Sequence, residues 1–301
     1  MAGQQASTAT LERLARRLLG RLPSRDREGG IDAIPVRHYG QPIIAVVLLF
    51  LLAGLLASVY RNKNIDHPTI AQYLTSSAIM NGLVTTLKLT IISGAVGLAL
   101  GVVVAVLRSS RNKVLSALSW LYIWLFRGTP LLAQILLWGN LALLFQNLEI
   151  GIPFTDITFF EAPTNVVVTA FVASVLGLGL NEGAYMSEVV RGGILAVDKG
   201  QAEAAKALGM TQAQTMRRIV LPQALRVIIP PTGNQMINLL KASSLVSVIA
   251  GGDLLTQAQL ISATNLRTIE LLVVATFWYL VIISIASVGQ YLLERRLGRG
   301  R

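Results

Sequence analysis

The chain has 301 residues, of which 53% are hydrophobic and only 14% are charged. This charged fraction is well below the ~25% of soluble domains, and apolar runs long enough to cross a bilayer recur along the sequence. The net charge of +11 falls in short segments between these runs, without the interleaved aromatic residues of a nucleic-acid-binding surface. The absence of cysteine excludes disulfides and thiolate metal sites. We therefore expect an all-α integral membrane protein that does not bind nucleic acid.

Six apolar runs are candidate membrane spans. The third run is interrupted by Arg127-Gly128-Thr129-Pro130. The first run follows a tail of 41 residues, which is too long to be the lead of a cleaved secretory signal, so we expect an uncleaved anchor helix there. In chain order the runs cover residues 42–60, 84–107, 116–145, 164–190, 226–250 and 269–292.

Lysine and arginine are unevenly distributed among the segments that separate these runs. Residues 1–41 contain seven arginines and residues 191–226 contain six basic side chains, whereas residues 146–165 contain three acidic side chains and no basic one. Basic residues accumulate in cytoplasmic loops, and the number of spans is even, so both termini are predicted to lie in the cytoplasm. Arg61 and Lys63, directly after the first run, are exceptions to this pattern.

The tail before the first run contains the segment TLERLARRLLGRL at residues 10–22. Its leucines recur at helical spacing, and its arginines surround the opposite face. This pattern is typical of a basic amphipathic helix that lies on anionic lipid. A solvated tail is the alternative, and the residues do not decide between the two.

The segment at 198–222 differs from the rest of the chain because it is polar, rich in alanine and well capped. Asp198 and Thr211 each precede a glutamine by three residues, which is the spacing of a capping box. Gly209 suits the left-handed residue that follows a first helix, and Pro222 is expected to end a second helix. The pattern predicts a helix, a tight turn and a second helix. A plain exposed connector between two spans is the alternative.

The same segment carries a known signature. Its residues Glu203-Ala204-Ala205, Gly209, Ile219 and Leu221-Pro222 match the pattern EAA-x3-G-x9-I-x-LP, and in this the chain resembles the membrane subunits of ABC importers. Ala242, directly after Lys241, departs from the polar amino-acid permeases, in which a polar residue often follows this lysine. Further stretches resemble the polar amino-acid permeases of that family: FRGTPLL at 126–132, AYMSEVVRGGI at 184–194, LPQALRVIIPP at 221–231 and LLKASSLVSVI at 239–249.

The resemblance implies a permease subunit of an ATP-driven amino-acid importer in the bacterial cytoplasmic (inner) membrane. Its transmembrane domain would cover residues 80–295, with five helices in addition to the anchor, and leave residues 1–60 outside. The implied partners are a dimer of cytosolic ATPases, a second permease subunit (identical or a paralogue), an extracytoplasmic solute-binding protein, the amino acid and membrane lipid. The ATPase-coupling residues would be Glu203, Ala204, Ala205, Gly209, Leu221 and Pro222.

The chain lacks the GxxxxGK[ST] phosphate loop, so it is not expected to hydrolyse ATP by that route. ATP and Mg²⁺ would be bound by the partner ATPase, and no cofactor, metal or catalytic residue is expected in this chain. Two other classes of protein are alternatives. A secondary transporter not driven by ATP would have no need of a docking loop, and an intramembrane enzyme would need a metal-binding or nucleophilic cluster, whereas the spans contain no histidine.

Polar residues at membrane depth are costly and therefore mark candidate pathway positions. Glu182, next to Asn181, could accept the ammonium group of an amino acid, or it could form an ion pair with Lys241 instead. Lys241, beside Ser243 and Ser244, could bind a substrate carboxylate.

The broken third run adds three more candidates, because irregular backbone at membrane depth must face protein or a wet cavity. Arg127, Thr129 and Gln134 could line the pathway or could repair the break locally. Two structural expectations complete the set. Glu188 and Arg191 should pair with each other. The small residues at 94–101 should allow close helix packing, either at a subunit interface or within this chain, and we favour packing within the chain.

Overall fold

The structure is a computed structural model that describes residues 40–152 and 158–298. The expected amphipathic segment 10–22 lies outside the described residues. The chain divides into two units, Met1–Asn62 and Lys63–Arg301. The described part of the first unit contains the uncharged helix α2, Gly40–Tyr60, which coincides with the predicted anchor.

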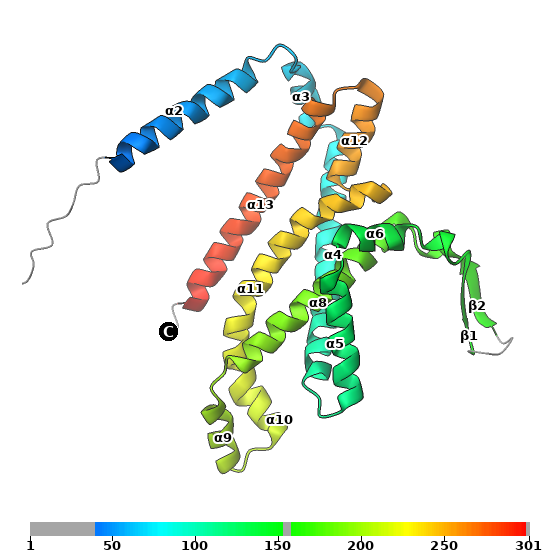
Figure 1. Ribbon diagram of the computed structural model, residues 1–301, viewed down its shortest axis with the longest axis vertical. Helices are drawn as coiled ribbons and strands as arrows, with labels where there is room; N and C mark the ends of the chain where they lie inside the picture. The colour runs from blue at the N-terminus through cyan, green and yellow to red at the C-terminus, as the bar shows by residue number, and fades with distance from the viewer. Residues whose placement is uncertain (1–39, 153–157, 299–301) are drawn as a thin grey trace, which may run out of the picture. The chain divides into compact units, whose positions relative to one another are not determined.

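The second unit is built mainly from the helices between α3 and α13 (Figure 1). Short helices cap and connect its long ones, and one two-stranded antiparallel sheet interrupts the helical order. The elements are α3 (His67–Leu74), α4 (Ser77–Arg108), α5 (Lys113–Gly128), α6 (Leu131–Gly139), η1 (Leu141–Leu143), β1 (Asn147–Gly151), β2 (Thr158–Pro163), α7 (Thr164–Val167), α8 (Ala170–Leu195), α9 (Lys199–Ala207), α10 (Gln212–Thr215), the π-helical turn η2 (Met216–Val220), α11 (Leu221–Ala242), η3 (Ser243–Ile249), α12 (Leu254–Asn265) and α13 (Thr268–Gly298).

The third predicted span is broken as expected, with α5 and α6 bent by 99° at the Gly-Thr-Pro sequence. The structure differs from the prediction in two respects. The fourth span begins later, at Ala170, because β2 and α7 occupy the preceding residues. The hairpin of β1 and β2 also means that the described chain is mainly helical rather than all-α.

The number of apolar helices is also lower than the six predicted. Among the described residues, α4 and α13 are long and apolar enough to cross a membrane, and up to four spans result if each of two bent helix pairs is one span. α8 has 26 residues but carries Asn181, Glu182 and Glu188, and the apolar stretch Ile44–Leu55 of α2 is shorter than the ~20 residues that a span needs.

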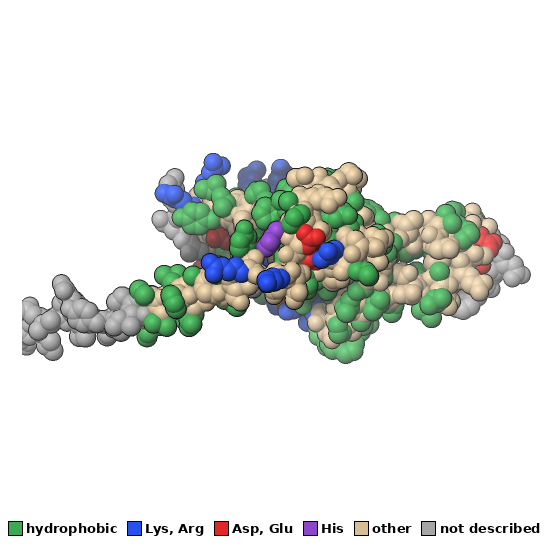
Figure 2. Space-filling model, turned by 90° about the horizontal axis from the view of Figure 1, so that it is seen from above, with side chains coloured by type: hydrophobic (Ala, Val, Ile, Leu, Met, Phe, Trp, Pro, Cys, Tyr) green, Lys and Arg blue, Asp and Glu red, His purple; other side chains and the backbone are tan. Residues whose placement is uncertain are grey.

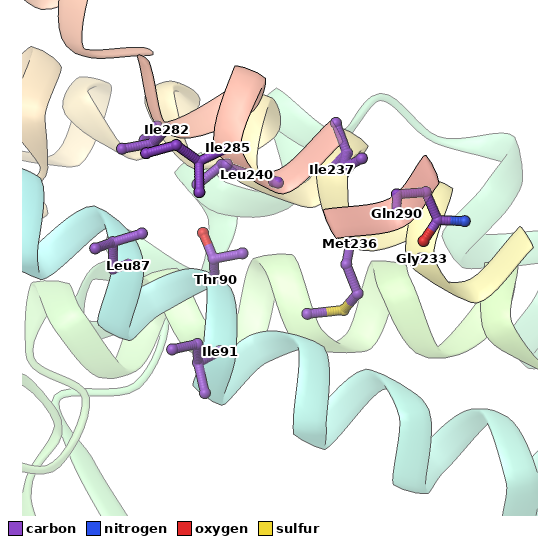
Figure 3. A pocket seen from close by; sticks show the side chains of 11 residues that line it. Leu87, Thr90, Ile91, Gly233, Met236, Ile237, Leu240, Ile282, Ile285 and Gln290 are labelled. Atoms are coloured by element: carbon purple, nitrogen blue, oxygen red, sulfur yellow. The ribbon is translucent and has the colours of Figure 1, made fainter. Parts of the chain in front are cut away.

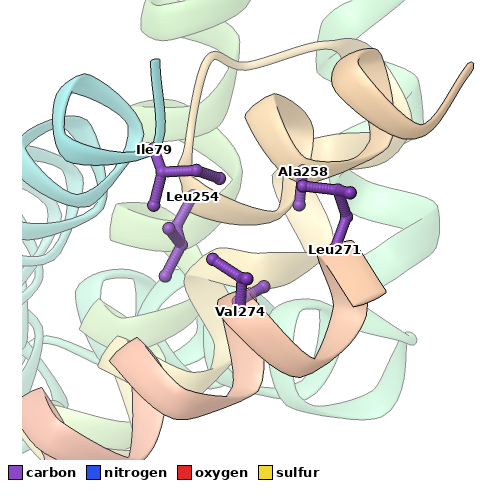
Figure 4. Close-up of a cluster of buried hydrophobic side chains, with 6 residues drawn as sticks. Ile79, Leu254, Ala258, Leu271 and Val274 are labelled. Carbon is purple, nitrogen blue, oxygen red and sulfur yellow. The ribbon is translucent and has the colours of Figure 1, made fainter. Parts of the chain in front are cut away.

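Helix α4 runs through three clusters of buried apolar side chains and so holds the second unit together. At one end, Ile79 of α4 packs with Leu254 of α12 and Val274 of α13 (Figure 4). In the middle, Leu89 packs with side chains from α6, α8, α11 and η3. At the other end, Ala105 packs with residues of α8 and α11.

The small residues of α4 pack within this chain, as expected. A Cβ atom added at Gly94 would lie 2.3 Å from the methyl carbon of Met236, and one at Gly97 would lie 2.7 Å from the Cβ of Glu182. At Gly101 the nearest atom would be the Cβ of Met186, at 2.4 Å. The glycines therefore let α4 approach α8 and α11 more closely than larger residues would allow.

This close approach gives a stability prediction. Gly101→Val should lower the free energy of unfolding by roughly 1–3 kcal/mol, because overpacking forces neighbouring side chains and backbone to shift. Thermal unfolding of the purified protein in detergent measures this loss. Gly289→Val is the matched control, since nothing lies within 4 Å of a Cβ added there. Equal melting temperatures for the two variants would contradict the prediction.

An ionic cluster joins the start of α3 to the start of α13. The backbone amide of Asp66 donates to the Glu270 carboxylate (3.0 Å), and the Arg267 guanidinium lies 3.5 Å from Asp66 and 3.8 Å from Glu270. Figure 2 looks onto this end of the molecule, where acidic and basic side chains lie side by side. The Trp278 indole also donates to the Leu74 carbonyl (2.7 Å), so α3 is held to α13 at both of its ends.

This cluster predicts a local pH dependence. The Thr69 hydroxyl and amide donate to the Asp66 carboxylate, and with the Arg267 charge they hold the pKa of Asp66 below its ordinary value of 3.8. A carboxyl whose pKa is lowered by folding stabilises the fold above that value and loses its contribution as pH falls through the lower, folded-state pKa. Hydrogen-exchange protection of α3 should therefore decrease as pH falls below 3.8, and Asp66→Asn should flatten this profile. Identical profiles would refute the assignment.

Candidate functional site

The polar loop after α8 begins with helix α9. The Asp198 carboxylate accepts the backbone amide of Gly200 (2.6 Å) and so caps the helix. The amide of Gln201 donates to the backbone carbonyl of Asp198 instead (3.2 Å). The capping box predicted here is therefore wrong, because the side chain of Asp198 reaches the second amide of the helix and not the third.

The end of α9 is set by Gly209, as predicted. Gly209 has φ of +77°, and nothing lies within 4 Å of a Cβ added there. Its amide donates to the Lys206 carbonyl (2.9 Å), and the amide of Met210 donates to the Ala205 carbonyl (3.1 Å). These two bonds form a Schellman motif, which needs a left-handed residue after the helix and strongly favours glycine.

The next turn, α10, has the second predicted capping box. The Thr211 hydroxyl accepts the amide of Gln214 (3.3 Å), and the Gln214 side chain accepts the amide of Thr211 (2.9 Å). Because both partners are satisfied locally, the connection between α9 and α10 has a defined conformation.

The role predicted for Pro222 is wrong. α10 does not end there but continues through the π-helical turn η2 into α11, where Pro222 lies in the first turn. Only Leu221 separates Pro222 from this π-helical turn, and the Gln223 side-chain amide donates to the carbonyl of Ile219 (2.9 Å). The loop is thus mechanically continuous with α11.

The helix pair presents its signature residues outward. Glu203, Ala204, Gly209, Leu221 and Pro222 are exposed, and Leu208 is 83% exposed at the tip. Ala205 is buried (4% exposed) and so belongs to the packed inner side of α9. Such an apolar tip with small residues beside a carboxylate is typical of a surface that docks on another protein.

The base of the loop is anchored in the bundle. Ala105, Val190, Ala224 and Ile228 form one buried cluster where α4 and α8 end and α11 begins. A Cβ atom added at Gly193 would lie 2.2 Å from the Ile228 side chain. A force on α9 and α10 would therefore act on α4, α8 and α11 together.

At the break between α5 and α6, three of the candidate pathway residues satisfy one another. The buried Gln134 amide donates to the Phe126 carbonyl (2.9 Å) and to the Thr129 hydroxyl (2.8 Å). The Asn181 amide donates to the same Phe126 carbonyl (2.8 Å) and to the Gln134 side-chain oxygen (3.3 Å). These contacts repair the broken helix and tie it to α8, which supports the structural alternative for Thr129 and Gln134. Asn181, which was predicted only as a pathway residue, takes part in the same repair.

The other candidate pathway residues with cationic or hydroxyl side chains do not take part in this hydrogen-bonded cluster. The Arg127 guanidinium lies over the Tyr185 ring, 5.0 Å from its centroid, and both residues line a cavity of about 520 Å³. Lys241 is exposed, and the hydroxyls of Ser243 and Ser244 donate to the carbonyls of Leu240 and Lys241 at the end of α11 (2.7 and 2.8 Å).

Glu182 is the exception, because it is buried without a partner among the described residues. Its side chain is 5% exposed, and its Oε1 atom has no hydrogen bond. The ion pair with Lys241, offered as an alternative, is absent from the pairs found in residues 40–152 and 158–298. The expected pair of Glu188 with Arg191 is confirmed at 2.6 Å. A buried carboxylate of this kind costs stability and therefore marks a functional candidate.

A separate groove lies between α4, α11 and α13 (Figure 3). It has a volume of about 460 Å³, and its walls are apolar except at Thr90 and Gln290. Gln290 donates to the Pro230 carbonyl (2.8 Å) inside α11 and to Glu294 (2.7 Å). None of the predicted pathway residues lines this groove.

Gln290 and Asp253 are buried polar residues that were not predicted from the sequence. Gln290 joins α13 to the proline-containing turn of α11, and no local signal marks it. Asp253 caps α12 by accepting the amides of Leu255 (3.0 Å) and Thr256 (3.3 Å), and an aspartate after two glycines and before an apolar run is a helix-start signal that could have identified it.

Residues 97–299 match the family described as the binding-protein-dependent transport system inner membrane component. The chain belongs to this family. It is therefore an inner-membrane permease that crosses the membrane several times and serves an ABC transporter for amino acids. The permease is a non-catalytic component, and such a transporter also requires an ATPase and a solute-binding protein.

Several relatives of the permease are known. It is 43% identical over 271 residues to the arginine transport system permease protein ArgU of Corynebacterium glutamicum, covering 90% of this chain and 84% of that one. It is 38% identical over 223 residues to the L-cystine transport system permease protein TcyB of Bacillus subtilis, covering 73% and 87%. The match to the arginine permease includes α2, so the segment expected to lie outside the resemblance is shared in part with this relative.

Solved structures agree with the fold. An amino acid ABC transporter with histidines matches with a TM-score of 0.66 at 37% identity, covering 77% of this chain and 99% of that chain. The inward-facing MetNI methionine ABC transporter matches with a TM-score of 0.55 at 17% identity, covering 73% and 95%. The second likeness concerns the fold alone.

Proposed function

We propose that α9 and α10 are the coupling helices of this permease and seat in a groove of a cytosolic ATPase dimer. The supporting observation is the continuous helical path from α10 through η2 into α11, which starts at an exposed, capped tip. Glu203, Ala204, Gly209, Leu221 and Pro222 would meet the ATPase, and Ala205 would support them from below. Closure of the ATPases would then move α11 together with the ends of α4 and α8. Coupling of this kind requires that the ATPase bind the two states of the permease differently.

The proposed topology has six spans, with both termini in the cytoplasm and residues 80–295 as the transmembrane domain. The distribution of basic residues supports it, because the coupling loop is basic and the β1–β2 hairpin contains Glu149 and Glu161 but no described basic residue. Figure 2 shows acidic side chains at the hairpin end of the molecule. A second permease subunit, identical or a paralogue, completes the pathway within membrane lipid.

The proposed substrate is a cationic amino acid of the arginine class. The 43% identity to an arginine permease over 90% of this chain supports this class. The buried carboxylate of Glu182 is the chemical complement, since it could accept the ammonium or guanidinium group of the substrate. Arg127, Lys241, Ser243 and Ser244 remain secondary candidates for contact with the substrate carboxylate.

Uptake into vesicles tests the proposal. The permease is reconstituted with its ATPase and solute-binding protein, and labelled arginine, lysine, histidine, glutamine and cystine are compared. Accumulation should require hydrolysable ATP and should favour the three basic amino acids. Equal accumulation of glutamine would contradict the substrate class, and accumulation without ATP would favour the alternative of a secondary transporter.

A further inference from the structure

The connection between α4 and α5 forms a small basic cavity. Arg108, Arg111 and Lys113 line a space of about 380 Å³ together with Ser116 and Trp120. The turn is well fixed, because the Arg108 guanidinium donates to the Ser116 hydroxyl (3.1 Å) and the Ser116 hydroxyl donates to the Arg108 carbonyl (3.2 Å). These bonds hold Arg108 in place at one wall of the cavity, while the side chains of Arg111 and Lys113 are exposed.

The charge of this cavity is unbalanced. None of its three cations has a described carboxylate oxygen within 4.0 Å. Glu188 lines the adjoining cavity, but it already pairs with Arg191 at 2.6 Å. Three like charges around one space repel one another, so an anion bound there would be favoured.

The position of the cavity in the fold indicates which kind of anion can reach it. α4 ends beside the base of the coupling loop, because Ala105 lies in the same buried cluster as Val190 and Ala224. On α5, Trp120 stacks on Trp124 with ring centroids 6.2 Å apart, and both rings are half exposed. Tryptophan side chains of this kind mark the boundary between membrane and water, so the cavity lies at the level of lipid headgroups.

We propose that this cavity binds the phosphate of an anionic glycerophospholipid in the cytoplasmic leaflet. Arginine binds phosphate through two parallel hydrogen bonds and lysine adds a mobile charge, while the Trp120–Trp124 face lies where the acyl chain would run. The Asn112 side chain already caps α5 at the amides of Val114 and Leu115 (2.9 and 3.4 Å), so the cations supply the binding. The assignment of the cavity to the cytoplasmic leaflet rests on the proposed topology.

The test uses the complete purified transporter in detergent, titrated with phosphatidylglycerol and followed by native mass spectrometry. Arg111→Gln/Lys113→Gln should weaken binding about 25-fold, from about 1 kcal/mol per charge. Both side chains are exposed and make no described hydrogen bond, so the fold should persist. Arg295→Gln/Arg296→Gln, on exposed residues near the end of α13, is the control that removes equal charge away from the cavity.

Two further titrations identify the source of the anion. Phosphatidylcholine should bind wild type and variants alike, and inorganic phosphate should bind far more weakly than the lipid. Equal loss of lipid binding in the cavity variant and in the control would overturn the proposal, as would phosphate binding as tight as that of the lipid. Loss of ATPase association without a change in lipid binding would assign the cavity to a protein contact instead. Uptake and ATP hydrolysis are measured on the same preparation. These two measurements test the coupling proposal independently, so a failure of the lipid proposal can be told apart from a failure of the coupling proposal.

Discussion

Glu203→Lys should reduce the association of the permease with its ATPase about 30-fold or more and return ATP hydrolysis to the rate of the free ATPase. Glu203 is exposed on α9 beside the apolar tip, and reversing a charge at the centre of a docked surface costs 2 kcal/mol or more. Because Glu203 makes no described contact within the permease, the fold should not change. Co-purification and transport-coupled hydrolysis measure the effect, and Glu149→Lys, on the exposed hairpin strand β1, is the control for assembly.

The geometry of the turn provides a second route to the same loss. Gly209→Val places a β-branched residue at φ of +77°, which costs roughly 1–2 kcal/mol. The ordered turn should then be populated about tenfold less, and coupling should fall in proportion. If both variants kept wild-type hydrolysis and uptake, the assignment of α9 and α10 as coupling helices would be wrong.

Glu182→Gln should reduce uptake of arginine about 30-fold or more while leaving the melting temperature unchanged or higher. Truncating one member of a desolvated charge pair costs 2–5 kcal/mol of binding, which is the effect expected if substrate supplies the missing charge. Without substrate, the buried carboxylate has no described partner for Oε1, so neutralising it removes a cost to folding. Functional residues commonly show this opposition between stability and activity.

Asn181→Ala is the matched contrast at the adjacent position. Asn181 donates to the Phe126 carbonyl and to Gln134, and leaving those acceptors unpaired should cost about 1–3 kcal/mol of stability. The two neighbours should therefore respond oppositely in thermal unfolding. A Glu182→Gln variant that was destabilised but transported arginine normally would show that Glu182 is structural.

Local signals explain why much of the coupling loop was predictable. The Thr211 box and the glycine that ends α9 depend on bonds between residues three to five apart, and these are visible in the order of residue types. The break at Gly128-Thr129-Pro130 is local too, because proline cannot donate the amide that a helix requires. Pro222 was misassigned because the same residue type suits both the end of one helix and the first turn of the next.

Long-range contacts explain what was not predictable. Asn181 and Phe126 are 55 residues apart, and Asn181 and Gln134 are 47 apart, so no periodicity along the chain could show that they repair the same break. The sequence could not show whether Glu182 has an ionic partner, for the same reason. Lys241 lies at a comparable depth in its own apolar run, which made it a candidate partner, yet it is exposed in the fold.

Composition, charge distribution and capping are properties of residues close together in the chain, so they were enough to predict a membrane protein with a capped polar loop. The resemblance to ABC importer subunits came from the residue types of that loop and not from composition or capping. Tertiary packing determines which of the candidate pathway residues satisfy one another, and it leaves Oε1 of Glu182 buried without a described partner. That outcome depends on how α4, α5, α6 and α8 pack. The free energy of a buried polar group is set by the neighbours that packing brings to it, however distant they are in the sequence.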